Sequence, residues 1–78
     1  MSSMNGHHYR DARLIQEKLS EAGHPDVALL IDDAVEEGSS ASEIRNRLRS
    51  TLTQIQDRHL NLPAQLEDEI ENLVRALD

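Results

Sequence analysis

The stretch from Ser40 to Arg58 repeats large apolar residues at the spacing of one helical face. The apolar positions recur every three or four residues, as Ile44, Leu48, Leu52 and Ile55. At 100° per residue they fall within about 80° of one another, which predicts a helix that buries one side against other helices. Ser40 and Glu43 have the spacing of a capping box, in which each side chain bonds the other residue's backbone N–H.

Three further stretches show the same periodicity, and glycine or proline separates them. Gly23 and Gly38 are typical of helix ends, and we expect Gly23 to adopt the left-handed conformation. Pro25 and Pro63 are typical of helix starts. We therefore expect helices at about 8–22, 25–37, 41–58 and 63–77. The predicted fold class is all-α, a small four-helix bundle with short connections. It is either up-and-down or turns a perpendicular corner at Gly38.

Length and composition bound the class of protein. We expect one helical domain over 7–78, preceded by a mobile N-terminal segment over 1–6. The chain has no cysteine, which excludes disulfide and thiolate chemistry. We find neither a membrane-spanning apolar run nor a signal peptide pattern, so we expect a cytoplasmic protein. The net charge of −7 argues against nucleic-acid or membrane binding and favours a partner with a basic surface.

The charges are distributed unevenly along the chain. Arginines border the apolar stripe of the segment 41–58, as Arg45, Arg47, Arg49 and Arg58. The simplest partners are the carboxylates beside the stripe of the last segment, which are Glu67, Glu69 and Glu71. The segment 25–37 ends with Glu36 and Glu37 at the negative end of its helix dipole, where a basic neighbour would relieve them.

One pattern resembles a helix-turn-helix motif. Ala34, Gly38 and Ile44 have its small–glycine–aliphatic spacing. The next helix offers residue types that contact DNA, which are Arg45, Asn46, Arg47 and Arg49. The pattern departs from the motif because Asp33, Ser39 and Arg47 stand where apolar residues are usual. An ordinary helix–glycine–helix corner explains the same residues, and DNA binding is the alternative function.

The sequence gives no pattern typical of a metal or catalytic site. His7, His8, His24 and His59 include no pair four residues apart, and no cysteine accompanies them. The serines lie at turns and caps, and the carboxylates on solvated helix faces. A bundle of this size also has little room for a pocket of about 300 Å³ or more. We therefore expect a non-enzymatic protein and assign no catalytic, metal or cofactor residue.

Two leucines fall outside the apolar stripes of their helices. Leu14 lies about 100° from Ile15, and Leu29 falls on the polar side of its helix. Single exposed leucines are common, but an apolar anchor ringed by carboxylates fits a basic partner. The candidate interface is therefore Leu14, Leu29, Asp32, Asp33 and Glu36. The predicted function is an acidic protein–protein interaction module, similar in type to an adaptor, immunity protein or inhibitor. A homodimer is compatible with this function, since self-association is one usual way in which small chains add core.

Overall fold

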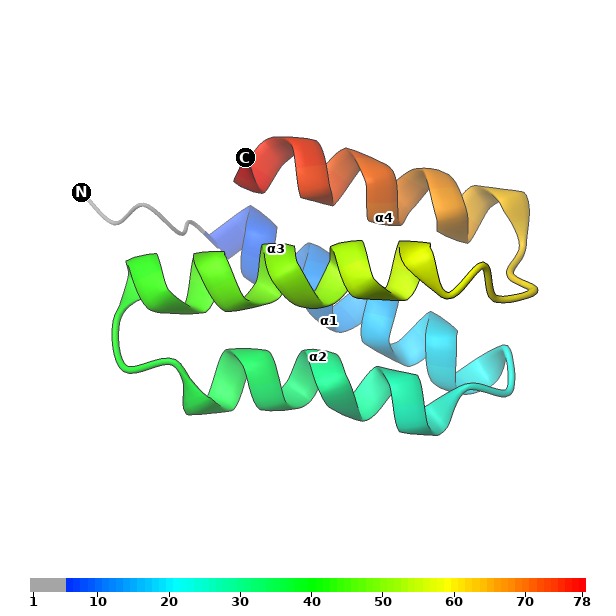
Figure 1. Cartoon of the computed structure of the whole chain (residues 1–78), viewed down its shortest axis with the longest axis horizontal. Helices are drawn as coiled ribbons and strands as arrows, with labels where there is room; N and C mark the ends of the chain where they lie inside the picture. Colours follow the sequence, from blue (N-terminus) through cyan, green and yellow to red (C-terminus); the bar gives the residue numbers. More distant parts are fainter. Residues whose placement is uncertain (1–5) are drawn as a thin grey trace.

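The computed structural model describes residues 6–78, with side chains from His8 onward, and folds them into four helices (Figure 1). The helices are α1 (Gly6–Glu21), α2 (Pro25–Glu37), α3 (Ala41–Asp57) and α4 (Ala64–Leu77). The predicted all-α four-helix fold is confirmed, and its boundaries agree to within about two residues. The predicted N-terminal segment lies outside the described residues except for Gly6, which begins α1.

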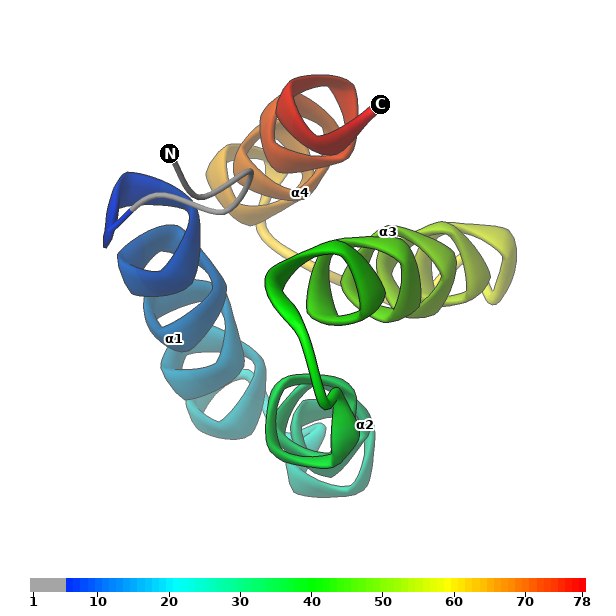
Figure 2. The same ribbon diagram turned by 90° about the vertical axis from the view of Figure 1, so that its left-hand side faces the viewer.

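The helices are arranged as an up-and-down bundle. Each helix packs against its neighbour in sequence, and α4 closes the ring against α1 (Figure 2). Helices α2 and α3 lie side by side and antiparallel, so the chain forms the first of the two predicted arrangements and no perpendicular corner at Gly38 (Figure 1). None of the described helices combines the length and the apolar character needed to cross a membrane.

The core consists of aliphatic side chains that the predicted stripes supply. The largest fully buried side chains are Ile15, Leu19, Val27, Ile31, Leu48, Leu52, Ile55 and Ile70. Helix α4 adds Leu66, Leu73 and Leu77, each at most 3% exposed. No polar side chain is buried among the described residues, so packing of apolar surface holds these helices together.

The two glycines that follow helices serve different purposes. Gly23 has φ of +94°, the left-handed conformation that the sequence predicted for a helix end. Gly38 has φ of −71°, which any residue can adopt. Glycine is needed there because a Cβ would overlap Cγ1 of Ile44 and lie 3.0 Å from its Cα. The close contact between Gly38 and Ile44 therefore lets α3 begin directly against the end of α2.

Half of the predicted capping box forms at the start of α3. The Ser40 hydroxyl accepts a hydrogen bond from the Glu43 N–H at 3.2 Å. The Glu43 carboxylate, in place of the Ser40 N–H, accepts from the Ser39 hydroxyl at 3.1 Å and from Arg47 Nε at 3.3 Å. Hydrogen bonding by the side chain and backbone of Ser39, and to a lesser extent the hydrogen bond and charge of Arg47, lower the pKa of Glu43. The acidic side chain also suits the positive end of the helix dipole.

Candidate functional site

Three large apolar side chains are substantially exposed among the described residues. Leu29 is 59% exposed, Leu14 is 46% and Tyr9 is 44%. The sequence did not single out Tyr9, and this side chain is engaged within the bundle. The guanidinium of Arg13 lies 5.2 Å from its ring centroid, and Arg13 Nη2 donates to its hydroxyl at 3.1 Å. The two leucines therefore remain as candidate anchors for a partner.

Leu29 lies in an acidic environment on α2. Every charged residue of α2 is acidic, as Asp26, Asp32, Asp33, Glu36 and Glu37. Leu29 also lines a shallow groove between α1 and α2, to which α1 contributes Glu17 and Glu21. We define the Leu29 surface as Leu29 with the exposed carboxylates of Glu17, Glu21, Asp33 and Glu36. It combines one apolar anchor with negative charge contributed by two helices.

Two of the predicted interface carboxylates have a structural partner. Arg13 of α1 donates to Asp32 at 2.7 Å and to Glu36 at 3.0 Å. The bond to Asp32 is the largest cause that raises the pKa of Arg13, which keeps the guanidinium charged. The side chain of Asp32 is 36% exposed, whereas that of Glu36 is 65% exposed. Asp32 therefore joins α1 to α2, and Glu36 still presents most of its carboxylate to solvent.

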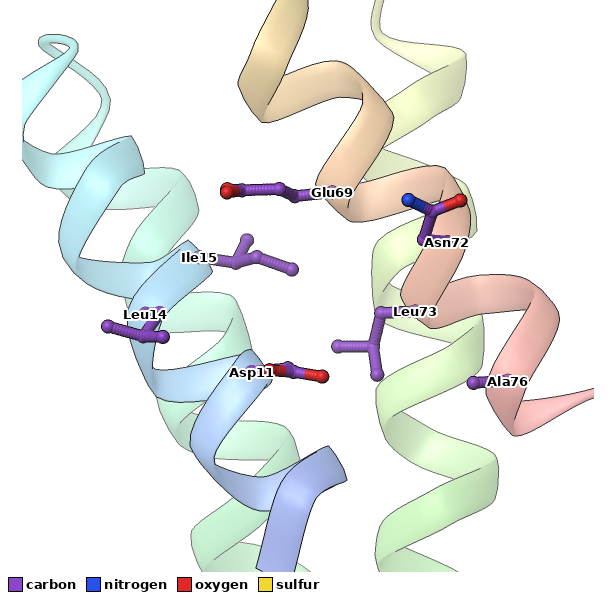
Figure 3. Close-up of a pocket in the computed structure, with 7 residues that line it drawn as sticks. All are labelled: Asp11, Leu14, Ile15, Glu69, Asn72, Leu73 and Ala76. Atoms are coloured by element: carbon purple, nitrogen blue, oxygen red, sulfur yellow. The ribbon is translucent and has the colours of Figure 1, made fainter.

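Leu14 lines a different groove, between α1 and α4 (Figure 3). The volume of this groove is about 200 Å³. Its lining residues are Asp11, Leu14, Ile15, Glu69, Asn72, Leu73 and Ala76. We call it the α1/α4 groove. The structure thus brings Leu29, Asp32, Asp33 and Glu36 together on α2, and it places Leu14 in a separate groove that the sequence did not predict.

Two arginines of α3, Arg45 and Arg49, bind the end of α4 instead of the predicted glutamates. Arg45 Nε donates to the Leu77 carbonyl at 2.8 Å, and Arg45 Nη2 donates to the Asp78 carbonyl at 3.0 Å. Arg49 pairs with the Asp78 carboxylate at 3.3 Å. Cations at this position satisfy backbone carbonyls that a helix end leaves open, and they suit its negative dipole.

The glutamates expected as partners of these arginines bind elsewhere. Glu69 pairs with Lys18 of α1 at 2.6 Å, and Glu71 pairs with Arg75 of its own helix at 3.3 Å. The sequence therefore predicted correctly that α3 arginines bond to α4, but the prediction that Glu69 and Glu71 accept these bonds is wrong. The Glu69–Lys18 pair joins α4 to α1 on the side where the ring of helices closes.

The candidate DNA contacts are divided between two places. Arg45, Asn46 and Arg49 line one shallow groove at the end of α4. Arg47 lies apart from it and pairs with Glu43. The two helices of a helix-turn-helix cross at about 90–120°, whereas α2 and α3 are antiparallel neighbours (Figure 1). The geometry of α2 and α3 therefore differs from that motif.

The histidines whose side chains the structure describes do not form a metal site. Across residues 6–78, no group of three or more His, Cys, Asp or Glu side chains is arranged to hold a metal ion. His24 precedes α2, and His59 follows α3 with φ of 51°. His8 is half-buried on α1, and the side chain of His7 lies outside the described part of the chain.

Comparison with known proteins gave no match to a family model, to a curated protein or to a solved structure. We therefore infer what the chain does from its own surfaces. The Leu29 surface and the α1/α4 groove each place one of the two exposed leucines beside carboxylates.

Proposed function

We propose that this chain is a small acidic, non-enzymatic module that binds another protein through the Leu29 surface. It acts in the cytoplasm in the manner of an adaptor, an immunity protein or an inhibitor. The observation that carries the proposal is the 59% exposure of Leu29 on a helix whose charged residues are all acidic. Interfaces of this kind place an apolar anchor at the centre and charged groups at the rim.

The charge of the surface selects the partner. The net charge of the chain is −7, and a symmetric dimer places the same patch of each copy against the other. A dimer through the Leu29 surface would bring Asp33 and Glu36 of two copies together, which is unfavourable. A partner with lysine or arginine around an apolar pocket is complementary both to the carboxylates and to the apolar side chain of Leu29. Light scattering tests for a homodimer through any other surface, since a constant mass near 8.8 kDa excludes one over the concentrations measured.

The residues of the surface contribute in different ways. Leu29 supplies the affinity, and its truncation should weaken binding by more than about 1 kcal/mol. The exposed carboxylates Asp33 and Glu36 act at the rim, where charge mainly raises the association rate and makes it depend on salt. Asp32 contributes less directly, because its carboxylate accepts from Arg13.

Affinity capture from the native host tests the proposal. The immobilised wild-type chain should retain a basic protein at low ionic strength and release it at high ionic strength. Leu29→Gln, which keeps a good helix former at this position, should lose that protein while its circular dichroism spectrum is unchanged. Thr53→Gln on the exposed side of α3 is the matched control and should retain it. Equal capture by Leu29→Gln and wild type would overturn the proposal.

DNA binding through α3 is the second candidate function. The observation in its favour is that Arg45, Asn46 and Arg49 line one groove. We rank it below protein binding because DNA would have to displace the bonds from Arg45 and Arg49 to the end of α4. The five carboxylates of α2 would also oppose an approach of phosphates to the neighbouring helix.

A further inference from the structure

We propose that the α1/α4 groove is a second docking site on this module, which receives an apolar side chain from a basic helix of a protein partner. The helix inserts that side chain beside a lysine or arginine of its own. This inference rests on the proposed function for the class of partner, but it concerns a different surface. Leu29 lines the groove between α1 and α2, whereas this groove lies between α1 and α4.

The size and lining of the groove fit one side chain. Its volume of about 200 Å³ is below the ~300–1,000 Å³ typical of small-molecule sites. Ile15 and Leu73 are buried and form its floor, while Leu14 and Ala76 are exposed at its edges. An aliphatic or aromatic side chain placed there covers Leu14, which is 46% exposed in the free chain.

Carboxylates lie at the two ends of this apolar floor. Figure 3 shows Asp11 extending from α1 toward α4 and Glu69 extending from α4 toward α1, with Ile15 and Leu73 between them. An occupant is therefore recognised by an apolar centre and by positive charge at one or both ends. A helix meets this requirement when an apolar residue and a lysine or arginine lie three or four positions apart.

Glu69 supplies a second indication of a cationic occupant. Its Oε1 accepts from Lys18 Nζ at 2.6 Å. Its Oε2 is enclosed, and no donor among the described residues bonds it. An enclosed polar atom without a partner is unfavourable, and more so when it is charged. A donor that enters with the occupant would satisfy this oxygen after a small rotation of the carboxylate.

The same charges argue against a second copy of this chain in the groove. A copy with a net charge of −7 would bring its own carboxylates toward Asp11 and Glu69. The arginine-rich helix of a copy, α3, already uses its three arginines within the chain, since Arg45 and Arg49 bind the end of α4 and Arg47 pairs with Glu43. The complementary occupant is therefore a lysine- or arginine-bearing helix of another protein.

Nuclear magnetic resonance titration tests the groove directly. The probe is a synthetic amphipathic helical peptide built from leucine and lysine, added to ¹⁵N-labelled full chain. We expect amide shifts around Leu14, Leu73 and Ala76. Ala76→Phe fills the groove from an exposed position on α4. It should lower the affinity for the peptide, as measured from these shifts, about tenfold or more. Ala64→Phe, the same substitution at an exposed position at the start of α4, should leave them unchanged.

The other arms separate the groove from the Leu29 surface. If the peptide shifts only amides of α2, and Leu29→Gln removes these shifts, the proposal that the α1/α4 groove binds the peptide is overturned. The proposed function through the Leu29 surface would remain in place. Equal binding of a leucine–glutamate peptide would overturn the cationic requirement. Groove shifts that grow with the concentration of the protein alone would assign the groove to a second copy and overturn the proposal. If Ala76→Phe lowers the helical signal, Asp11→Lys repeats the test without filling the groove and should also lose the peptide.

Discussion

Arg13 Nη1 of α1 lies 2.7 Å from Asp32 Oδ1 of α2, and its Nη2 lies 3.0 Å from Glu36 Oε1. One guanidinium thus compensates the negative end of the acidic helix, where the sequence predicted a basic neighbour. Tyr9 also contacts the guanidinium, through its ring and its hydroxyl. This arrangement ties α2 to α1 while Leu29 and Asp33 stay exposed.

Arg13→Met should destabilise the bundle by about 1 kcal/mol, because two interhelical pairs of ~0.2–1 kcal/mol each are lost and the apolar stem is kept. For a chain of this size that corresponds to a fall of about 4–8 °C in Tm. Arg10→Met is the control, since Arg10 is exposed on the same helix and methionine and arginine have similar helix propensity. An equal Tm for the two variants would show that the Arg13 bonds contribute nothing measurable.

Gly38→Ala should destabilise the fold by about 1–3 kcal/mol, because its Cβ overlaps Cγ1 of Ile44. Chemical denaturation measures the loss. The double variant Gly38→Ala/Ile44→Ala should lose less than the sum of its two single variants, since the second substitution removes the overlapping atom. Gly23→Ala is the comparison. A Cβ at position 23 meets nothing within 4 Å, so the cost of Gly23→Ala comes from φ of +94° alone. The losses of stability caused by Gly23→Ala and Ile44→Ala should therefore be fully additive. Full additivity in both pairs would contradict the contact.

Glu43 should stabilise the start of α3 in a pH-dependent way. Its pKa is lowered in the folded chain, chiefly by the hydrogen bond from Ser39, so the folded state favours the charged form. The stabilisation is therefore present above the ordinary glutamate pKa of about 4.3 and is lost as the pH falls through the lower folded value. Thermal melts should show Glu43→Gln below wild type in Tm at pH 7 and a closing gap at acidic pH. A gap that stays constant from pH 7 to the acid limit would count against this role.

Arg45→Met should loosen the last turn of α4, because Arg45 bonds the carbonyls of Leu77 and Asp78. Hydrogen exchange should accelerate at the amides of that turn, and Tm should fall by a few degrees, as expected for a loss of about 1 kcal/mol. A gel shift with mixed duplex DNA at low salt separates this role from the DNA-binding alternative. Strong retention by wild type, lost when Arg45, Arg47 and Arg49 are changed to Ala, would reverse our ranking of the two functions.

The sequence was sufficient for the fold because each helix carries its own signal. The stripe of Leu48, Leu52 and Ile55 is buried as predicted, and Gly23 ends α1 in the predicted conformation. The role of Gly38 could not be read in the same way. Its need for space depends on how closely α3 approaches α2, which is a tertiary relationship.

Interhelical partners were the less predictable part, because helical periodicity gives the side on which a charge lies but not its height along the bundle. Glu69 faces Lys18, which is 51 residues earlier in the sequence, and Arg45 reaches backbone carbonyls that carry no side-chain signal. For the candidate site, periodicity predicted correctly that Leu14 and Leu29 lie outside the stripes. It could not show that they line grooves on two different helix pairs.

Site-specific photo-crosslinking from position 29 in the native host tests the proposed function most directly. A photoreactive phenylalanine analogue replaces Leu29 in one variant and Gln54, which is exposed on α3, in the control. The proposal predicts a single crosslinked basic protein from position 29 and none from position 54. Crosslinks from position 54 with none from position 29 would contradict binding through the Leu29 surface.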